Sequence, residues 1–200
     1  MLKELRPALV LLVLFTILTG VIYPFVTTGI ASVLFPYQAR GSLIEHEGRV
    51  IGSALIGQNF TEARYFQGRP SATLAADPSD PSKTIAAPYN AANSGGSNLG
   101  PTSKALIERM TSEVEALKPQ NPGVRVPTDL VTTSASGLDP DISPEGALFE
   151  VPRVAKARGL PEARVRELVG RQTEGRTFGV LGEPRVNVLA LNLALDALKP

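Results

Sequence analysis

The chain has 200 residues, and its 20 lysines and arginines almost equal its 19 aspartates and glutamates, for a formal net charge of +1. This balance provides no basic surface of the kind that binds nucleic acid, so no nucleic-acid partner is expected. The sequence contains no cysteine and one histidine, His46. Disulfides, thiolate metal sites, cysteine nucleophiles and histidine-rich metal centres are therefore excluded.

An uncharged apolar segment dominates the N-terminal part of the sequence. Between Arg6 and Arg40 the only ionisable side chains are two tyrosines, and residues 8–26 are almost all apolar. A bilayer core about 30 Å thick needs roughly 20 such residues in a helix, which satisfies its own backbone hydrogen bonds. We therefore predict a transmembrane helix with an outer interfacial extension over residues 8–35.

Two alternatives compete for this segment. A cleavable signal peptide has an apolar stretch of about 7–15 residues before small residues at the cut, and the best cut here follows Ala31. A buried core helix would rarely continue this far without a charge. The length of the apolar run favours the membrane-spanning helix over both, and the missing cysteine excludes a lipoprotein anchor.

The charges that flank the apolar segment predict its orientation. Lys3 and Arg6 precede it with a single glutamate, whereas no basic residue follows it before Arg40. By the positive-inside rule, residues 1–7 are expected in the cytoplasm and residues 36–200 outside, as one extracytoplasmic domain.

Small and polar residues recur at four-residue spacing along the span, at Thr16, Gly20, Pro24 and Thr28. Such a stripe lets a second helix backbone approach closely, so these residues are predicted to dock a partner inside the membrane. The alternative is that the span merely tolerates them.

After the anchor, the sequence predicts a hairpin and then irregular chain. Residues 42–45 and 49–57 have strand character and flank a turn at His46–Gly48. Residues 60–72 interleave aromatic residues with arginines, which fits a docking surface or a short helix. Residues 75–101 are so rich in proline, glycine, asparagine and serine that we predict no regular element, but an ordered interaction loop.

Within that loop, the glycine-rich stretch Ser94–Gly100 invites comparison with a phosphate-binding loop. It lacks the Gly-Lys-Ser/Thr ending of such a loop, and Pro101 removes one backbone donor. Its residues Gly95, Gly96 and Asn98 are instead predicted to contact a partner protein.

The C-terminal half alternates helices with turns. We predict a helix from Thr102 or Ser103 to Leu117, a strand over residues 124–133 and a turn-rich loop over residues 134–143. Three further helices are predicted: one capped by Ser143 and ended by Gly159, one opened by Pro161, and one over Val186–Leu198.

No set of residues in the sequence indicates a catalytic site. The sequence lacks Gly-x-Ser-x-Gly, and its histidine falls in a predicted turn. Asp139 and Asp141 have the spacing of an acid–base or metal pair, but beside Pro140 they fit turns and a helix N-terminus better. Arg153, Lys156 and Arg158 are expected on a solvated helix face or against a partner's carboxylates. The residues therefore predict an α+β protein with one transmembrane helix, no catalytic or metal site, and the role of an accessory subunit or binding module.

Several stretches, spread over nearly the whole chain, resemble the C-subunit family of the Kdp potassium-transporting ATPase. They are Arg6–Ala8, Gly20–Pro24, Gly52–Phe60, Tyr65–Ala72, Asn93–Pro101, Val131–Pro140, Arg153–Gly159 and Val186–Asn192. The resemblance implies a bacterial inner-membrane complex with a channel-like, potassium-binding A subunit, a P-type ATPase B subunit and a small F subunit. It implies that this chain acts in assembly and potassium affinity and is not the hydrolase.

The resemblance also implies a nucleotide site at Ser136, Gly137, Leu138 and Asp139, together with a family glutamine whose place is taken here by Glu150. A carboxylate at that position would repel phosphates, and an external domain meets little ATP. ATP is therefore a cofactor by resemblance alone. The alternative function is a membrane-anchored nucleotide sensor whose domain lies in the cytoplasm.

Overall fold

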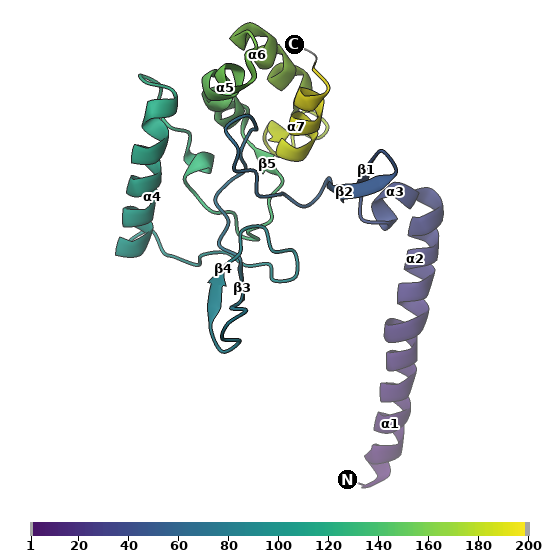
Figure 1. The fold of residues 1–200 in the computed structure, drawn as a ribbon. Coiled ribbons are helices and arrows are strands. Elements are labelled where there is room, and N and C mark those ends of the chain that lie inside the picture. The colour runs from purple at the N-terminus through teal and green to yellow at the C-terminus, as the bar shows by residue number, and fades with distance from the viewer. Residues whose placement is uncertain (1, 199–200) are drawn as a thin grey trace. The chain divides into compact units, whose positions relative to one another are not determined.

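The computed structural model describes residues 2–198 and divides into two compact units, one ending at Ser53 and one beginning at Ala54. Both helices and strands are present, as predicted for an α+β protein (Figure 1).

The N-terminal unit begins with the predicted apolar helix. It consists of α1 (Leu2–Ile17), a π-helical turn (Leu18–Ile22) and α2 (Tyr23–Leu34). Residues Lys3–Leu34 have a mean hydropathy of 2.5 in their most apolar 18-residue window, and none of that window is buried, so by length and composition this helix can cross a membrane.

A proline explains the π-helical turn inside this helix. Pro24 has no N–H to donate to the carbonyl of Gly20, so a regular α-helical ladder would lose a bond there. The N–H of Tyr23 instead reaches back to the carbonyl of Leu18, which widens the turn.

The predicted hairpin follows the short helix α3 (Pro36–Ala39). Strands β1 (Leu43–His46) and β2 (Arg49–Ser53) pair antiparallel. Glu47 and Gly48 both have positive φ, at 50° and 75°, which is the geometry of a tight hairpin turn. The hairpin is confirmed, although β2 ends at Ser53 and not at residue 57.

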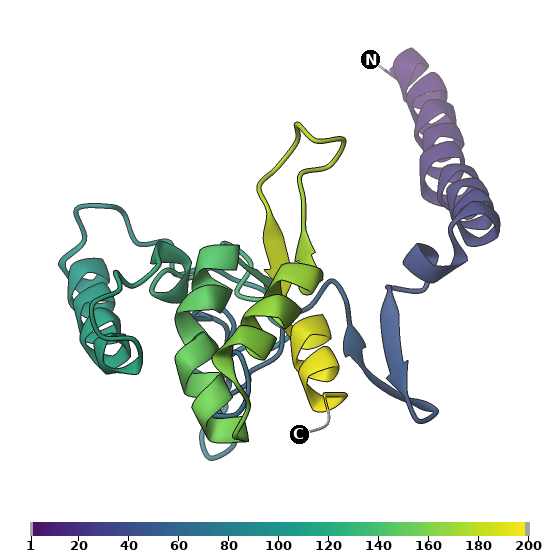
Figure 2. The ribbon, with the colours of Figure 1, turned by 90° about the horizontal axis from the view of Figure 1, so that it is seen from above.

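The second unit is built around three helices and a small sheet. Helices α5 (Pro144–Arg158), α6 (Glu162–Gln172) and α7 (Val188–Asp196) pack beside the antiparallel sheet β5–β7–β6, with β5 at Asp141–Ile142, β6 at Thr173–Glu174 and β7 at Arg185–Asn187 (Figure 2). Their apolar faces form the core, whose members include Phe66, Phe149, Val154, Val165, Leu168, Val186, Leu191 and Leu195.

The predicted boundaries of α5 and the inward face of α6 are confirmed. Ser143 Oγ accepts a hydrogen bond from Gly146 N at 2.9 Å, and Pro144 is the first helical residue. Gly159 ends α5 in the left-handed conformation at φ 65°. In α6, Val165 is among the buried residues, as predicted.

Three local predictions are wrong. Residues 124–133 form no strand: the proline at 127 cannot donate to a ladder, and the segment has only the 3₁₀ turn Thr128–Leu130. Residues 75–101 do contain regular structure, because β3 (Leu74–Ala76) pairs with β4 (Thr84–Ala86). The last helix begins at Val188, since the preceding residues form β7.

Helix α4 (Lys104–Leu117) is present as predicted, with Ser103 at its N-cap position. The Ser103 hydroxyl makes no capping bond, and none of the residues of α4 is fully buried. A 3₁₀ turn at Lys118–Gln120 ends it beside the predicted prolines.

Candidate functional site

Two polar loops, identified in the sequence for different reasons, pack against each other in the second unit. Gly95 N donates to the carbonyl of Ser136 at 2.9 Å, and Ser94 Oγ donates to the same oxygen at 3.0 Å. A Cβ on Gly96 would lie 2.8 Å from the carbonyl oxygen of Ala135, so the two backbones touch only because a glycine is present. We call this contact region, residues 94–97 and 134–139, the loop junction.

Gly137 lies at the centre of the loop junction. Its φ is +67°, and a Cβ there would approach Thr73 Cγ2 to 2.5 Å and the carbonyl oxygen of Gly95 to 2.7 Å. Its own carbonyl accepts a hydrogen bond from Ser71 Oγ at 2.7 Å. Conformation and space therefore both require glycine at this position.

The backbone of Ser136 and Leu138 is also engaged within the protein. The Leu138 carbonyl accepts from Gly57 N at 2.8 Å, and Leu138 N donates to Ser136 Oγ at 3.1 Å. The second of these bonds takes a backbone N–H, the kind of group that a phosphate-binding loop would direct at its ligand.

An arginine holds Asp139 in place. Arg69 Nη1 lies 3.0 Å from Asp139 Oδ2, and the same guanidinium donates to the carbonyls of Thr132 and Thr133 at 3.4 and 3.3 Å. Tyr89 donates its hydroxyl proton to the Arg69 carbonyl at 2.7 Å. Burial, with a smaller contribution from the Asp139 charge, raises the pKa of Tyr89 to about 12, so the phenol remains a neutral donor.

Glu150 belongs to a second cluster, inside α5. Its carboxylate is buried, forms an ion pair with Arg153 and accepts a hydrogen bond from Gln67 N at 3.1 Å. Arg153 also donates to the carbonyls of Ala63 and Tyr65 at 2.6 and 3.0 Å. Burial raises the pKa of Glu150 to about 7, although the Arg153 charge opposes the shift.

The predicted nucleotide residues thus divide between two clusters. Ser136, Gly137, Leu138 and Asp139 lie together in the loop junction, whereas the Glu150 carboxylate is enclosed by Gln67 and Arg153. Both clusters contact the same segment, residues 67–69. Asp139 pairs with Arg69, and Glu150 accepts a hydrogen bond from Gln67 N. We call these two contacts the clamp on residues 67–69.

The predicted partner-docking residues also lie in different places. Thr16, Gly20, Pro24 and Thr28 are exposed along the apolar helix, with Gly20 inside its π-helical turn. Gly95 and Gly96 are half-buried in the loop junction, while Asn98 is exposed and has a φ of 51°. No structural finding tests docking by these residues, so it stays a prediction.

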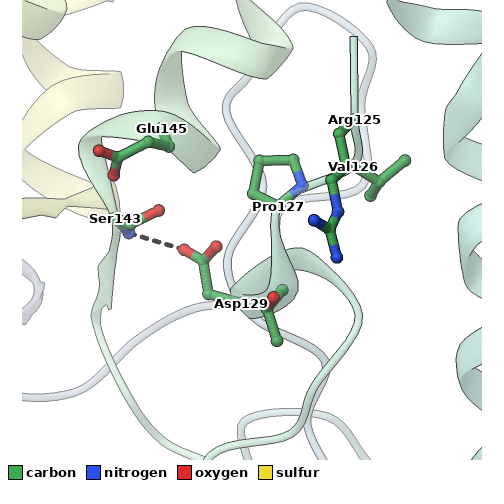
Figure 3. A pocket seen from close by; sticks show the side chains of 7 residues that line it. Arg125, Val126, Pro127, Asp129, Ser143 and Glu145 are labelled. Atoms are coloured by element: carbon green, nitrogen blue, oxygen red, sulfur yellow. Dashed lines mark hydrogen bonds between the residues drawn. The ribbon is translucent and has the colours of Figure 1, made fainter.

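A pocket opens where the segment before η3 (Thr128–Leu130) meets the start of α5 (Figure 3). Asp129 Oδ2 accepts a hydrogen bond from Ser143 N at 2.7 Å across its floor, and Arg125 and Glu145 stand at its sides. Within residues 2–198, no three histidine, aspartate or glutamate side chains gather as a metal site would require.

The chain is similar to a known family of proteins over almost its whole length. Residues 5–197 match the family described as "KdpC: K+-transporting ATPase, c chain". A protein of Rhodopseudomonas palustris strain BisB18, named potassium-transporting ATPase KdpC subunit, is 70% identical over 199 residues, which is 100% of each chain. Proteins of the same name from Bradyrhizobium diazoefficiens and Methylobacterium nodulans are 68% and 67% identical over 98% and 99% of this chain, and over 98% of each relative.

The chain belongs to the KdpC family. It is therefore a component of a potassium-transporting ATPase, as the sequence stretches predicted. Three of those stretches, Tyr65–Ala72, Asn93–Pro101 and Val131–Pro140, meet in the loop junction of this KdpC chain and in the clamp on residues 67–69.

Several side chains of these clusters were not predicted from the sequence, and the solvated helix face predicted for Arg153, Lys156 and Arg158 is found only at Lys156, which is exposed. Arg69 and Tyr89 carry no local signal, because their partners lie far along the chain. Arg153 and Arg158 are not on a solvated face: their side chains are only 13% and 14% exposed, and they pair with Glu150 and Asp196. The three-residue spacing from Glu150 to Arg153 was a signal that could have revealed the first pair.

Proposed function

We propose that this chain is a non-catalytic subunit of a high-affinity, ATP-driven potassium import complex. It acts in assembly and stabilisation of the complex and in potassium affinity, beside a channel-like subunit that binds the ion. The observation that carries this proposal is the KdpC match over residues 5–197 in a chain whose N-terminal helix suits a membrane.

The engagement of the polar side chains supports a non-catalytic role. Asp139 is paired with Arg69 and Glu150 with Arg153, so both carboxylates already serve the fold. His46 is exposed at the end of β1 and is not one of the residues of the loop junction. ATP hydrolysis then belongs to a P-type ATPase partner.

The proposed partners are the potassium-binding A subunit, the P-type ATPase B subunit, the small F subunit and the lipid bilayer. Lys3 and Arg6 at the start of the helix support a cytoplasmic N-terminus in the bacterial inner membrane, with residues 36–200 outside. In this arrangement the exported domain lies over the potassium entrance.

Nucleotide contact by Ser136–Asp139 and Glu150 stays a prediction implied by the family resemblance. The side of the membrane on which the domain lies distinguishes a nucleotide-binding role from the proposed role. Alkaline phosphatase fused after residue 200 should be active if the domain is outside, whereas a fluorescent cytoplasmic fusion with inactive phosphatase would favour a nucleotide sensor.

Deletion of this chain tests the proposed function. With the other subunits retained, cells should lose growth at very low potassium, and the remaining subunits should no longer purify together in full yield. Growth that is unchanged at low potassium would defeat the proposal. Restoring the wild-type chain from a plasmid is the control.

A further inference from the structure

The segment between β6 and β7 forms a narrow projection with an apolar tip. Residues 175–184, which we call the finger, extend beyond the sheet as the yellow-green loop of Figure 2. At the tip, Phe178 is 91% exposed, Val180 71% and Leu181 59%. Phe178 is the most exposed large hydrophobic side chain in the part of the chain that the structure describes.

The finger is an ordered turn. Thr177 and Leu181 exchange two backbone hydrogen bonds, of 2.9 and 3.0 Å, and Gly179 N donates to the Arg176 carbonyl at 3.0 Å. Phe178 within this turn has a φ of 54°, in the left-handed region that aromatic residues rarely occupy. Neither burial nor backbone preference in the isolated subunit favours phenylalanine here, which points to a use outside the subunit.

The charges at the base of the finger compensate each other. Arg176 lies 2.6 Å from Glu183, and Arg185 lies 2.7 Å from Glu174 and 3.1 Å from Asp141. Residues 174–185 contain no lysine, so every basic side chain of the segment is paired. Attraction to anionic lipid requires an excess of basic side chains, which this segment lacks.

The tip is also too small to hold two copies of the chain together. A stable protein interface buries about 1,200–2,000 Å² in total, whereas an aromatic side chain buries about 150–250 Å². A small apolar tip whose neighbouring charges compensate each other is suited to fill a pocket that excludes water. It would then act as one anchor within a larger contact.

We propose that the tip of the finger, Phe178 with Val180 and Leu181, inserts into an uncharged apolar cleft on another subunit of the potassium-transport complex. This inference rests on the proposed function, because it requires that the chain be an assembled subunit. It adds the surface and the chemistry by which the chain is held.

Phe178→Asn in the full-length, affinity-tagged chain is the first test. Asparagine tolerates the left-handed backbone, so the subunit should fold at least as well as the wild type. Loss of the buried ring should lower the affinity for the other subunits about tenfold or more, measured by their recovery from detergent-solubilised membranes. Val124→Ser, which polarises a 49% exposed side chain on the loop before η3 and outside the finger, should leave recovery unchanged.

The same experiment separates this inference from the proposed function. If the tagged wild type recovers the other subunits and Phe178→Asn recovers them equally, the finger is not an anchor while the proposed function stands. If the wild type recovers none of them, both are overturned.

Site-specific photocrosslinking identifies the occupant. A benzophenone side chain placed at position 178 of the assembled complex should form an adduct with another subunit, identified by mass spectrometry. Adducts with lipid only, with a second copy of this chain only, or no adduct at all would overturn the inference.

Discussion

At the scale of single residues, Glu150 gives a sharp prediction about pH. Burial raises its pKa from 4.5 to about 7, so the folded state binds this proton more tightly than the unfolded chain. The resulting stabilisation is complete below pH 4.5 and is lost as the pH rises through 7. Arg153 opposes the shift, and the Asp129 charge adds to it.

Comparison with Glu150→Gln isolates this contribution, because glutamine does not titrate. The free energy of unfolding of the wild type minus that of the variant should fall by on the order of 3 kcal/mol between pH 4.5 and pH 7. Urea unfolding of both proteins in detergent at several pH values measures this difference. A difference that is constant with pH would show that Glu150 keeps an ordinary pKa.

Two glycines in the left-handed conformation allow the cost of backbone strain to be distinguished from the cost of steric overlap. Gly159 has a φ of 65° with open space around its missing Cβ, so Gly159→Ala should cost only the left-handed penalty, about 1–2 kcal/mol. Gly137 has a nearly equal φ of 67°, but its Cβ would meet Thr73 and Gly95. Gly137→Ala should therefore cost about 1–3 kcal/mol more in unfolding free energy. Equal losses of unfolding free energy in the two variants would mean that the loop junction rearranges to accommodate a methyl group.

At the scale of elements, two serines at N-cap positions can be compared, one that caps its helix with its side chain and one that does not. Ser143 Oγ accepts from Gly146 N, so Ser143→Ala should lower the unfolding free energy by about 1 kcal/mol. Ser103 occupies the same position before α4 without a side-chain capping bond, so Ser103→Ala should change stability much less. Thermal unfolding of both variants in one buffer compares them, and a larger loss at Ser103 would contradict the assignment.

The elements that the sequence predicted correctly are those whose signals are local. Ser143 with Pro144 fixes one end of α5 and Gly159 the other, and the apolar run before Arg40 defines a helix by composition alone. Strands β3 and β4 were missed because each has only three residues, and the pair is held in part by side chains from outside the strands. Asn90 and Asn93, for example, both donate to the Leu74 carbonyl, at 2.8 and 2.9 Å.

The candidate site was predictable only in part for the same reason. Both polar loops were recognised from their glycines and serines, and the resemblance named Ser136–Asp139. Their mutual contact depends on Gly95 meeting Ser136, and the pairing of Asp139 with Arg69 spans 70 residues. Spacing along a single sequence does not encode such contacts.

At the scale of the whole molecule, the core belongs entirely to the second unit. Every residue of the core cluster lies between Phe60 and Leu198, and the unit boundary falls earlier, between Ser53 and Ala54. The N-terminal unit contributes an apolar helix and a two-stranded hairpin, and an isolated hairpin of two strands is at best marginally stable in water. Folding of the domain and attachment to the membrane are therefore separable properties of the chain.

A truncated chain that begins at Ala54 tests this separation. It keeps the whole core, and Asn187 Nδ2 keeps its bond of 2.9 Å to the Ala54 carbonyl, so its unfolding midpoint should lie within a few degrees of the domain transition in the full chain. Without the apolar helix it should be recovered in the soluble fraction and fail to restore growth at low potassium. Far-UV circular dichroism during heating measures the first property, and cell fractionation with complementation measures the second. A broad, non-cooperative transition would show that the domain needs its anchor to fold, and full complementation would show that the helix is dispensable for transport.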